Sequence, residues 1–248
     1  MVVNDHVDSI FYEKSLYKLG WSQFKQNQNR EAIASYIKLL DRKQQQQMLD
    51  EVKLADNLAR TEQELIEDVL RVTSLAFSYL PDREPIAQYF NRAGQRPYEP
   101  LLYQKLAELY LGKERITDAA NILLAYGERF PFSQYRAQFH SRVIDIYKGS
   151  AFSSLLLPEK ERFVEQYNVN TAFWQQQDPA TQAELQPILA SHISDIATHY
   201  HATARSSKKS ADYRRAAGWY QLYLDSFPQD PKAPHINFLL AESRFDAG

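Results

Sequence analysis

The chain has 248 residues, of which 44% are hydrophobic and 24% charged, and its formal net charge is −2. This is the composition of an ordinary globular protein, and a charge so close to zero gives no general attraction to nucleic acid or to an anionic membrane. No apolar run approaches the roughly 18 residues that a membrane-spanning helix needs. The first ten residues lack the basic start and apolar centre of a signal peptide, and the absence of cysteine excludes disulfides and thiolate metal sites.

Helices are the only regular elements that the sequence predicts. In the stretch LIEDVLRVTSLAFSYL, residues 65–80, apolar residues recur three and four apart, and no sustained alternation indicates a sheet. All eleven prolines are expected at helix edges, because a proline inside a helix removes a hydrogen bond. No helix is predicted for 167–178. In chain order the predicted helices cover 8–27, 29–47, 55–80, 84–94, 98–112, 116–129, 133–148, 158–166, 180–205, 209–227 and 233–247.

A small residue recurs at a fixed offset between neighbouring predicted helices. Glycine inside a helix costs up to about 1 kcal/mol, so a second helix packed very close is expected to compensate for it. In the first unit the expected packing stripe is Leu16, Leu19 and Gly20. The small residues pair across successive helices as Gly20 with Ala32, Ala107 with Ala119, and Ala204 with Ala216.

This pattern resembles the tetratricopeptide repeat, a helix–turn–helix unit of 34 residues. The match is fullest between Pro100 and Pro131, where Tyr103, Leu106 and Tyr110 stand at the signature spacing. The resemblance implies an all-α, right-handed solenoid of antiparallel helix pairs over 1–248, with an irregular middle section. Clear repeats lie near 13–46, 100–131 and 197–230, a degenerate one near 69–98, a half repeat at 234–248 and a non-repeat insert at about 132–196.

Two stretches, residues 17–41 and 236–248, are similar to repeats of bacterial envelope proteins such as outer-membrane assembly lipoproteins. The similarity implies a scaffold at the periplasmic face of the outer membrane, or in the periplasm, of a Gram-negative bacterium. The alternative is a cytoplasmic adaptor. The last predicted helix is expected to end a fragment, with further repeats beyond Gly248. In that case Phe238, Leu239 or Phe245 would be exposed.

Partner binding is expected in the concave groove, on the first helix of each repeat. Tyr17, Trp21 and Phe24 share one helix face at i, i+4 and i+7, and aromatic residues in a surface groove are typical anchors for a bound segment. The alternative is that Trp21 and Phe24 are core residues, packed on a preceding helix or on Ile10 and Phe11. The expected partner-binding residues are Tyr17, Trp21, Phe24, Gln104, Glu108, His201 and Arg205.

These positions also exclude one family function. Co-chaperone members of the family hold a partner's terminal carboxylate with Lys and Asn at positions five and nine of the first helix. The three clear repeats carry other residues there, so this role is disfavoured. The pairs present are Tyr17 with Trp21, Gln104 with Glu108, and His201 with Arg205.

No motif predicts catalysis or a cofactor, since the chain lacks a P-loop, a GxSxG turn and a glycine-rich dinucleotide turn. His192, Asp195 and His199 are the best candidate metal ligands. However, residues seven apart lie about 10 Å apart along a helix, too far to share one ion. An enzyme or a metal-binding domain is therefore the least favoured alternative, and no metal or other cofactor is expected.

The stretch ARSSKKSADYRR, residues 204–215, is the main basic cluster. It falls at the turn between two predicted helices, where polar residues are ordinary, and it lacks the interleaved aromatic residues that stack on bases. Nucleic-acid binding is not expected, and a local contact with an acidic partner or a lipid headgroup is a minor alternative. The cluster contains Arg205, Lys208, Lys209, Arg214 and Arg215.

Overall fold

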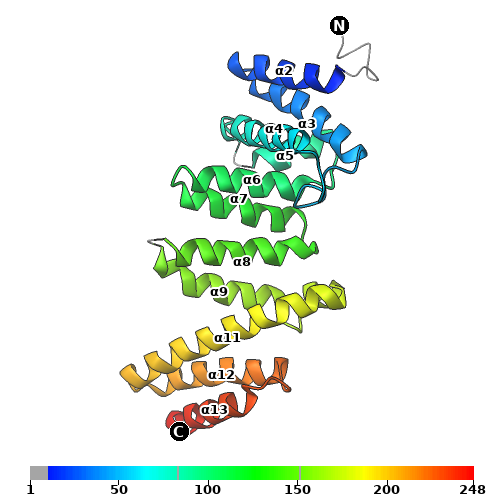
Figure 1. Cartoon of the computed structure of the whole chain (residues 1–248). Helices are drawn as coiled ribbons and strands as arrows, with labels where there is room; N and C mark the ends of the chain where they lie inside the picture. Colours follow the sequence, from blue (N-terminus) through cyan, green and yellow to red (C-terminus); the bar gives the residue numbers. More distant parts are fainter. Residues whose placement is uncertain (1–10, 83, 151) are drawn as a thin grey trace. The chain divides into compact units, whose positions relative to one another are not determined.

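The computed structural model describes residues 11–82, 84–150 and 152–248. Within these ranges all the regular secondary-structure elements are helices (Figure 1). A single isolated bridge, between Leu49 and Leu54, is the one β-type pairing there. The predicted all-α fold is therefore confirmed. The chain divides into two compact units, Met1–Arg129 and Phe130–Gly248.

The first unit is a succession of helices, each packed on a neighbour. Its helices are α2 (Tyr12–Lys25), α3 (Asn29–Gln45), α4 (Arg60–Ser78), α5 (Pro85–Ala93), α6 (Glu99–Leu111) and α7 (Ile116–Arg129). α2 packs on α3, α3 on α4, α4 on α6, and α6 on α7. The short helix α5 is followed by Gly94 as its C-cap, whose φ of 83° is a conformation that glycine adopts without steric cost.

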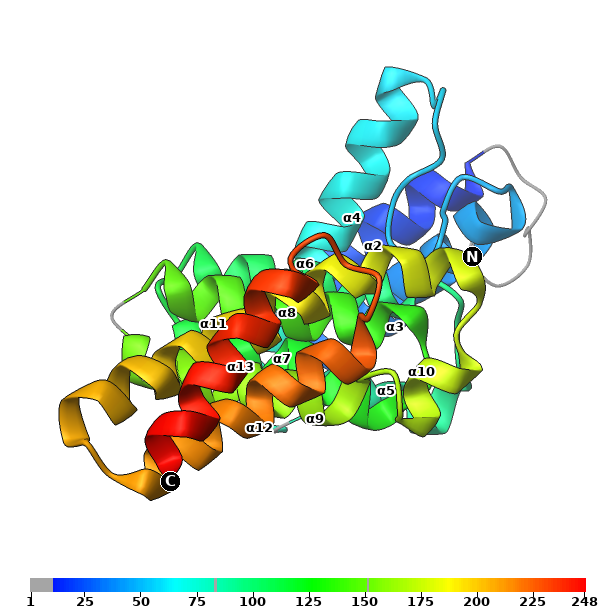
Figure 2. The ribbon, with the colours of Figure 1, turned by 90° about the horizontal axis from the view of Figure 1, so that it is seen from below.

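The second unit begins at Phe130, two residues before the predicted non-repeat insert at about 132–196. Its helices are α8 (Gln134–Lys148), α9 (Ser153–Tyr167), α10 (Ala172–Gln176), α11 (Pro179–Ser207), α12 (Ser210–Ser226) and α13 (Ala233–Ala247). α8 packs on α9, α9 on α11, and α11 on α12, and α12 lies beside α13 (Figures 1 and 2). The core of this unit includes the buried Phe163, Tyr167, Leu189, Ile193 and Tyr220.

The small residues lie at close helix contacts, as the sequence predicts. Gly20 is buried, and a Cβ atom at this position would lie only 2.5 Å from Cε1 of Tyr36. Ala32, Ala107 and Ala119 are each 0% exposed. In the first unit, however, the side chain that meets Gly20 is the ring of Tyr36. Because Gly20 of α2 has no side chain, the buried ring of Tyr36 on α3 can pack directly against its backbone.

Leu19 does not belong to the packing stripe that the sequence predicts. Leu16 is 0% exposed, whereas Leu19 is 37% exposed. Consecutive residues differ by about 100° around a helix, so Leu19 points well away from the side of Gly20 that α3 covers. The equivalent Leu106 is 0% exposed, because α6 packs on both α4 and α7.

Two prolines lie inside helices, contrary to the expectation that all of them mark edges. Pro158 is in α9 and Pro187 is in α11. Each leaves one backbone carbonyl without its helical donor, that of Ser154 and that of Ala183. Both prolines and both of these residues are exposed, so water can bind the two carbonyls. A proline on the solvent side of a helix thus costs less than the sequence rule implies.

The remaining helix boundaries agree with the prediction except in a few places. Residues 55–59, expected to be helical, precede α4 as a loop, and α9 begins at Ser153 rather than at 158. The short α10 forms within 167–178, where no helix was expected. The predicted start of the first helix, residues 8–10, lies outside the described residues.

Candidate functional site

A row of aromatic side chains runs along α2 in the first unit. Tyr17 and Trp21 have ring centroids 6.5 Å apart, and those of Trp21 and Phe24 are 6.0 Å apart, both edge to face. Tyr79, the residue after α4, lies 6.0 Å from Phe24 and is 58% exposed. The three α2 rings are half-buried. These four residues are here called the aromatic row.

A carboxylate on α4 holds the row in place. Tyr17 Oη donates a hydrogen bond of 2.6 Å to Asp68 Oδ2, and Arg71 Nη2 lies 2.5 Å from Asp68 Oδ1. Burial alone would raise the pKa of Asp68, but hydrogen bonds from Tyr17, Arg71 and Trp21 outweigh it and lower the pKa. The guanidinium of Arg71 lies 5.9 Å from the ring centroid of Trp21. The row is therefore fixed to α4 before any partner arrives.

Trp21 and Phe24 fit neither of the two alternatives entirely. They are half-buried, so they are neither core residues nor fully open anchors: Asp68 and Arg71 of α4 contact Trp21, and Tyr79 contacts Phe24. The uncovered part of each ring remains on the surface. Such half-covered aromatic side chains are rigid, which lowers the entropic cost of binding a partner.

A small cavity continues this surface between α4 and α6. Its volume is about 270 Å³, and Arg71, Ser74 and Leu109 are among the residues that line it, with Glu67, Lys105 and Glu108. The Ser74 hydroxyl is buried and has no hydrogen-bond partner among the described residues. The cavity is below the size that usually holds a drug-sized molecule, and it suits a single amino-acid side chain.

Of the two α6 residues expected to bind a partner, Glu108 lines this cavity and Gln104 is hydrogen-bonded to Glu108. Gln104 Nε2 donates to Glu108 Oε1 at 3.2 Å, and Lys105 Nζ is 3.0 Å from Glu108 Oε2. The aromatic row, the cavity and these half-buried side chains form the surface that we call the α2–α4–α6 face. It brings together the predicted residues Tyr17, Trp21, Phe24, Gln104 and Glu108.

Sequence reasoning missed the contribution of α4 to this face. Arg71 and Ser74 belong to the degenerate repeat near 69–98 and Asp68 directly precedes it, and none of them stands at a position that the repeat pattern marks. The one available signal was the spacing of Asp68 and Arg71, three residues apart on one side of a helix.

The structure places His201 and Arg205 elsewhere, on α11 in the second unit. His201 is only 4% exposed, and its Nδ1 lies 3.2 Å from Tyr220 Oη, because this side of α11 packs against α12. Burial and the nearby Arg205 lower the pKa of His201. Arg205 is exposed and pairs with Glu242 at 2.6 Å. His201 is therefore a core residue of the second unit, whereas the α2–α4–α6 face belongs to the first.

The other candidate clusters do not assemble a reactive site. Asp195 pairs with Lys160 at 2.5 Å, and both ring nitrogens of His192 are buried without a partner among the described residues. Within the described ranges no three His, Cys, Asp or Glu side chains are placed to hold a metal ion. In the basic cluster, Arg215 pairs with Glu161 at 3.0 Å and lies over the ring of Tyr200.

A buried histidine in the second unit has the neighbours of a catalytic one. His140 Nε2 lies 2.7 Å from Glu159 Oε1, and its Nδ1 lies 3.2 Å from Tyr167 Oη. His140 and Tyr167 are each 1% exposed, and the Glu159 side chain is 14% exposed. Burial lowers the pKa of His140 although Glu159 acts in the opposite direction.

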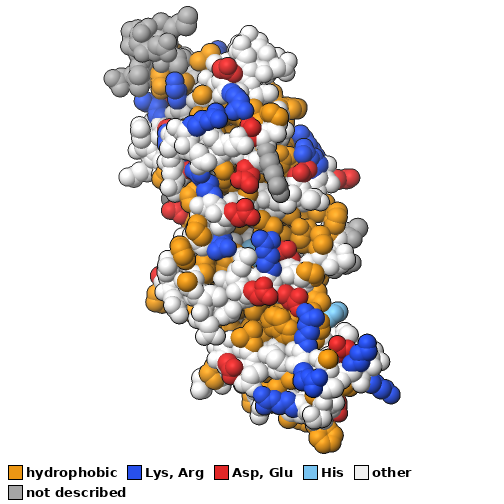
Figure 3. Space-filling model, turned by 180° about the vertical axis from the view of Figure 1, so that it is seen from behind, with side chains coloured by type: hydrophobic (Ala, Val, Ile, Leu, Met, Phe, Trp, Pro, Cys, Tyr) orange, Lys and Arg blue, Asp and Glu red, His pale blue; other side chains and the backbone are white. Residues whose placement is uncertain are grey.

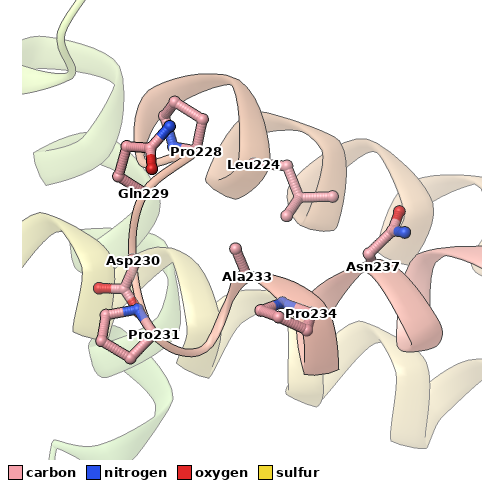
Figure 4. Close-up of a pocket in the computed structure, with 8 residues that line it drawn as sticks. All are labelled: Leu224, Pro228, Gln229, Asp230, Pro231, Ala233, Pro234 and Asn237. Atoms are coloured by element: carbon pink, nitrogen blue, oxygen red, sulfur yellow. The ribbon is translucent and has the colours of Figure 1, made fainter.

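A second hollow lies at the turn between α12 and α13 (Figure 4). It is open, has a volume of about 490 Å³, and includes Pro228, Pro231 and Pro234 among its lining residues. Further along α13, Phe238 is 65% and Phe245 86% exposed. Leu239, for which exposure was also expected, is half-buried.

Two comparisons with known proteins found no match for this chain. No protein-family model matches the chain, and no curated protein sequence matches it. Among the described helices, none combines the length and apolar character needed to cross a membrane.

Proposed function

We propose that the chain is a non-catalytic scaffold that binds a segment of a partner protein on its α2–α4–α6 face. One observation carries the proposal: a preorganised row of half-covered aromatic rings runs beside a cavity sized for one side chain. Aromatic residues next to a small pocket are the usual energetic centre of a protein–protein interface. The polar groups around them, Arg71, Lys105 and Glu108, supply the rim.

We infer the wider setting from the repeat resemblance. Successive helices pack on their neighbours in both units, which is the arrangement that a repeat solenoid would have. The likeness to envelope repeats makes a periplasmic assembly the proposed setting, and a cytoplasmic adaptor the alternative. Fractionation of cells that make the product of the whole gene would separate these two compartments.

Selection of peptide ligands tests the binding function itself. Peptides of 12 residues would be selected on the chain from a random displayed library, and their contacts mapped by hydrogen exchange. We expect the bound peptide to slow amide hydrogen exchange in α2, α4 and α6. Protection confined to the α12–α13 hollow, or the absence of any selected ligand, would contradict the proposed site.

Two substitutions sharpen the test. Tyr79→Ala removes the most exposed ring of the row, and Leu109→Glu places a charge in the cavity. Each should weaken peptide binding by about tenfold or more, because truncating a central anchor usually costs at least 1.4 kcal/mol. Phe132→Ala is the matched control, since Phe132 is 48% exposed but lies in the second unit. It should leave peptide affinity unchanged.

A further inference from the structure

A stripe of lysines runs along the solvent side of α2, beside the aromatic row. Lys14, Lys18 and Lys25 are all exposed. At 100° and 1.5 Å per residue, they lie within an arc of about 40° and span about 17 Å of the helix. Trp21 is only about 20° from Lys14 around the same helix. These three residues are here called the lysine stripe.

The stripe has no neutralising partner within the described part of the chain. The only acidic residue of α2, Glu13, faces the other way and accepts hydrogen bonds from Arg42 at 3.0 Å and Lys43 at 2.6 Å. No described carboxylate pairs with any of the three lysines. Like charges four residues apart on a helix oppose its stability. Lys14 and Lys18 therefore repel each other, and an acidic partner would relieve this repulsion.

Further cations continue the positive potential along the aromatic row. Arg71 lies over Trp21, and Lys113 Nζ is 5.8 Å from the ring centroid of Tyr79. Asp68 already neutralises Arg71, whereas Lys113 has no ion-pair partner among the described residues. Figure 3 shows charges of both signs interspersed over one face of the molecule.

We propose that the partner segment is acidic, with at least two side-chain carboxylates for the lysine stripe and one large apolar side chain for the aromatic row. This rests on the proposed function of the α2–α4–α6 face and names the chemistry of its ligand. A stripe of about 17 Å matches about five residues of extended chain. The carboxylates come from side chains along the segment and need no chain terminus.

A protein segment fits these observations better than an anionic bilayer does. Binding at a membrane surface needs apolar side chains that protrude between the lipids. Here the α2 rings are half-buried, and Tyr17 Oη is turned to Asp68 on the neighbouring helix. A peptide can enter the space beside the rings, whereas a flat bilayer would meet the lysines and leave the rings uncovered.

The test uses the peptides selected on the chain from the random library. The tightest peptide would be resynthesised with each Glu changed to Gln and each Asp to Asn, and both forms titrated by fluorescence anisotropy. We expect acidic residues to be enriched near one large apolar residue, and the neutral form to bind at least tenfold more weakly. The difference should shrink in high salt, because the charges are exposed.

Variants of the chain assign the preference to the stripe. In the triple variant Lys14→Gln, Lys18→Gln and Lys25→Gln, the acidic and neutral peptides should bind within threefold of each other. The control variant removes the same charge at exposed lysines elsewhere and should keep the full preference. Its substitutions are Lys38→Gln, Lys148→Gln and Lys232→Gln.

The possible failures separate the two proposals. One outcome is a peptide that slows hydrogen exchange in α2, α4 and α6 and yet binds equally well after its Glu and Asp are changed to Gln and Asn. This result would overturn the proposal of an acidic partner segment and leave the proposed function standing. Ligands that bind elsewhere, or none at all, would overturn both. Binding of the chain to vesicles of phosphatidylglycerol through the stripe, with no selected peptide on this face, would also overturn the acidic segment.

Discussion

At the scale of single residues, Gly20 shows how one missing methyl group shapes a helix contact. Its α-carbon faces the ring of Tyr36, which is 0% exposed. Gly20→Ala gains about 1 kcal/mol of helix propensity. The clash with the ring should outweigh this gain and leave the first unit about 1–3 kcal/mol less stable in urea unfolding.

Gly218→Ala is the matched control for that substitution. Gly218 lies within α12, and a Cβ atom there would meet nothing within 4 Å. It should therefore gain stability, by about 0.5–1 kcal/mol. A Gly20→Ala variant as stable as Gly218→Ala would show that Tyr36 does not fill the place of the missing side chain.

His192 should make the second unit sensitive to mild acid. Burial, with a smaller effect of Lys160, lowers the pKa of His192 to about 4, whereas an unfolded histidine titrates near 6.5. The unfolded chain therefore binds the proton first. The stability that depends on neutral His192 is fully present above pH 6.5 and is lost as the pH falls toward 4, by about 2 kcal/mol between pH 7 and 5.

Urea unfolding at pH 7 and pH 5 would check this expectation. His192→Phe keeps an aromatic ring beside Phe163, whose centroid is 5.0 Å away, and should reduce the acid loss. His140 and His201 also have lowered pKa values, so part of the loss should remain. His235→Phe, at an exposed histidine, should keep the wild-type pH dependence.

At the scale of helices, Lys43 joins three elements through one ammonium group. It is 2% exposed, and its Nζ lies 2.6 Å from Glu13 of α2 and 2.5 Å from Glu62 of α4. Lys43→Met would leave Glu62 without this cation and Glu13 paired with Arg42 alone. Because both carboxylates are partly exposed, the expected loss is about 1–3 kcal/mol rather than the larger cost of a fully buried pair.

The pH dependence of the Lys43 variant gives a second readout. Burial would raise the pKa of Glu13, but hydrogen bonds from Lys43, Gln46 and Arg42 lower it. The stability that ionised Glu13 contributes is present above pH 4.5. It is lost as the pH falls through the pKa that Glu13 has in the folded chain. Lys43→Met should therefore cost less at pH 3 than at pH 7. An equal cost at both would indicate lost packing instead of lost pairing.

The helices of this chain could be predicted because their signals are local. Apolar residues three and four apart mark the buried side of each helix, and the offset from Gly20 to Ala32 marks a helix pair. The exposure of Leu19 depends on which helices cover α2, and the tolerance of Pro187 depends on which side of α11 meets water. Both properties depend on tertiary packing, which cannot be read from local patterns in a single sequence.

The candidate site was only half predictable for the same reason. The spacing of Tyr17, Trp21 and Phe24 placed three rings on one face, and the structure keeps them together. The carboxylate that fixes them, Asp68, lies 51 residues from Tyr17 in the sequence. His201 has the repeat position of a groove residue, but the packing of α12 on α11 buries it.

At the scale of the whole molecule, the second unit has a hydrophobic cluster of its own. The buried cluster of the second unit runs from Ala137 on α8 to Leu240 on α13 without a residue from the first unit. We therefore expect a chain of residues 130–248 to fold alone, with helical circular dichroism and a cooperative urea transition. A non-cooperative melt would show that this cluster is insufficient by itself.

The positions of the tryptophans give the chain a built-in optical reporter. Trp21 is the one tryptophan of the first unit, and the sequence has only two others, Trp174 and Trp219. Replacing those two with phenylalanine would leave a single emitter inside the aromatic row, with the guanidinium of Arg71 above it. A ligand that covers the ring would exclude water and shift its emission to the blue. Occupancy of the face is thus readable in solution without any label.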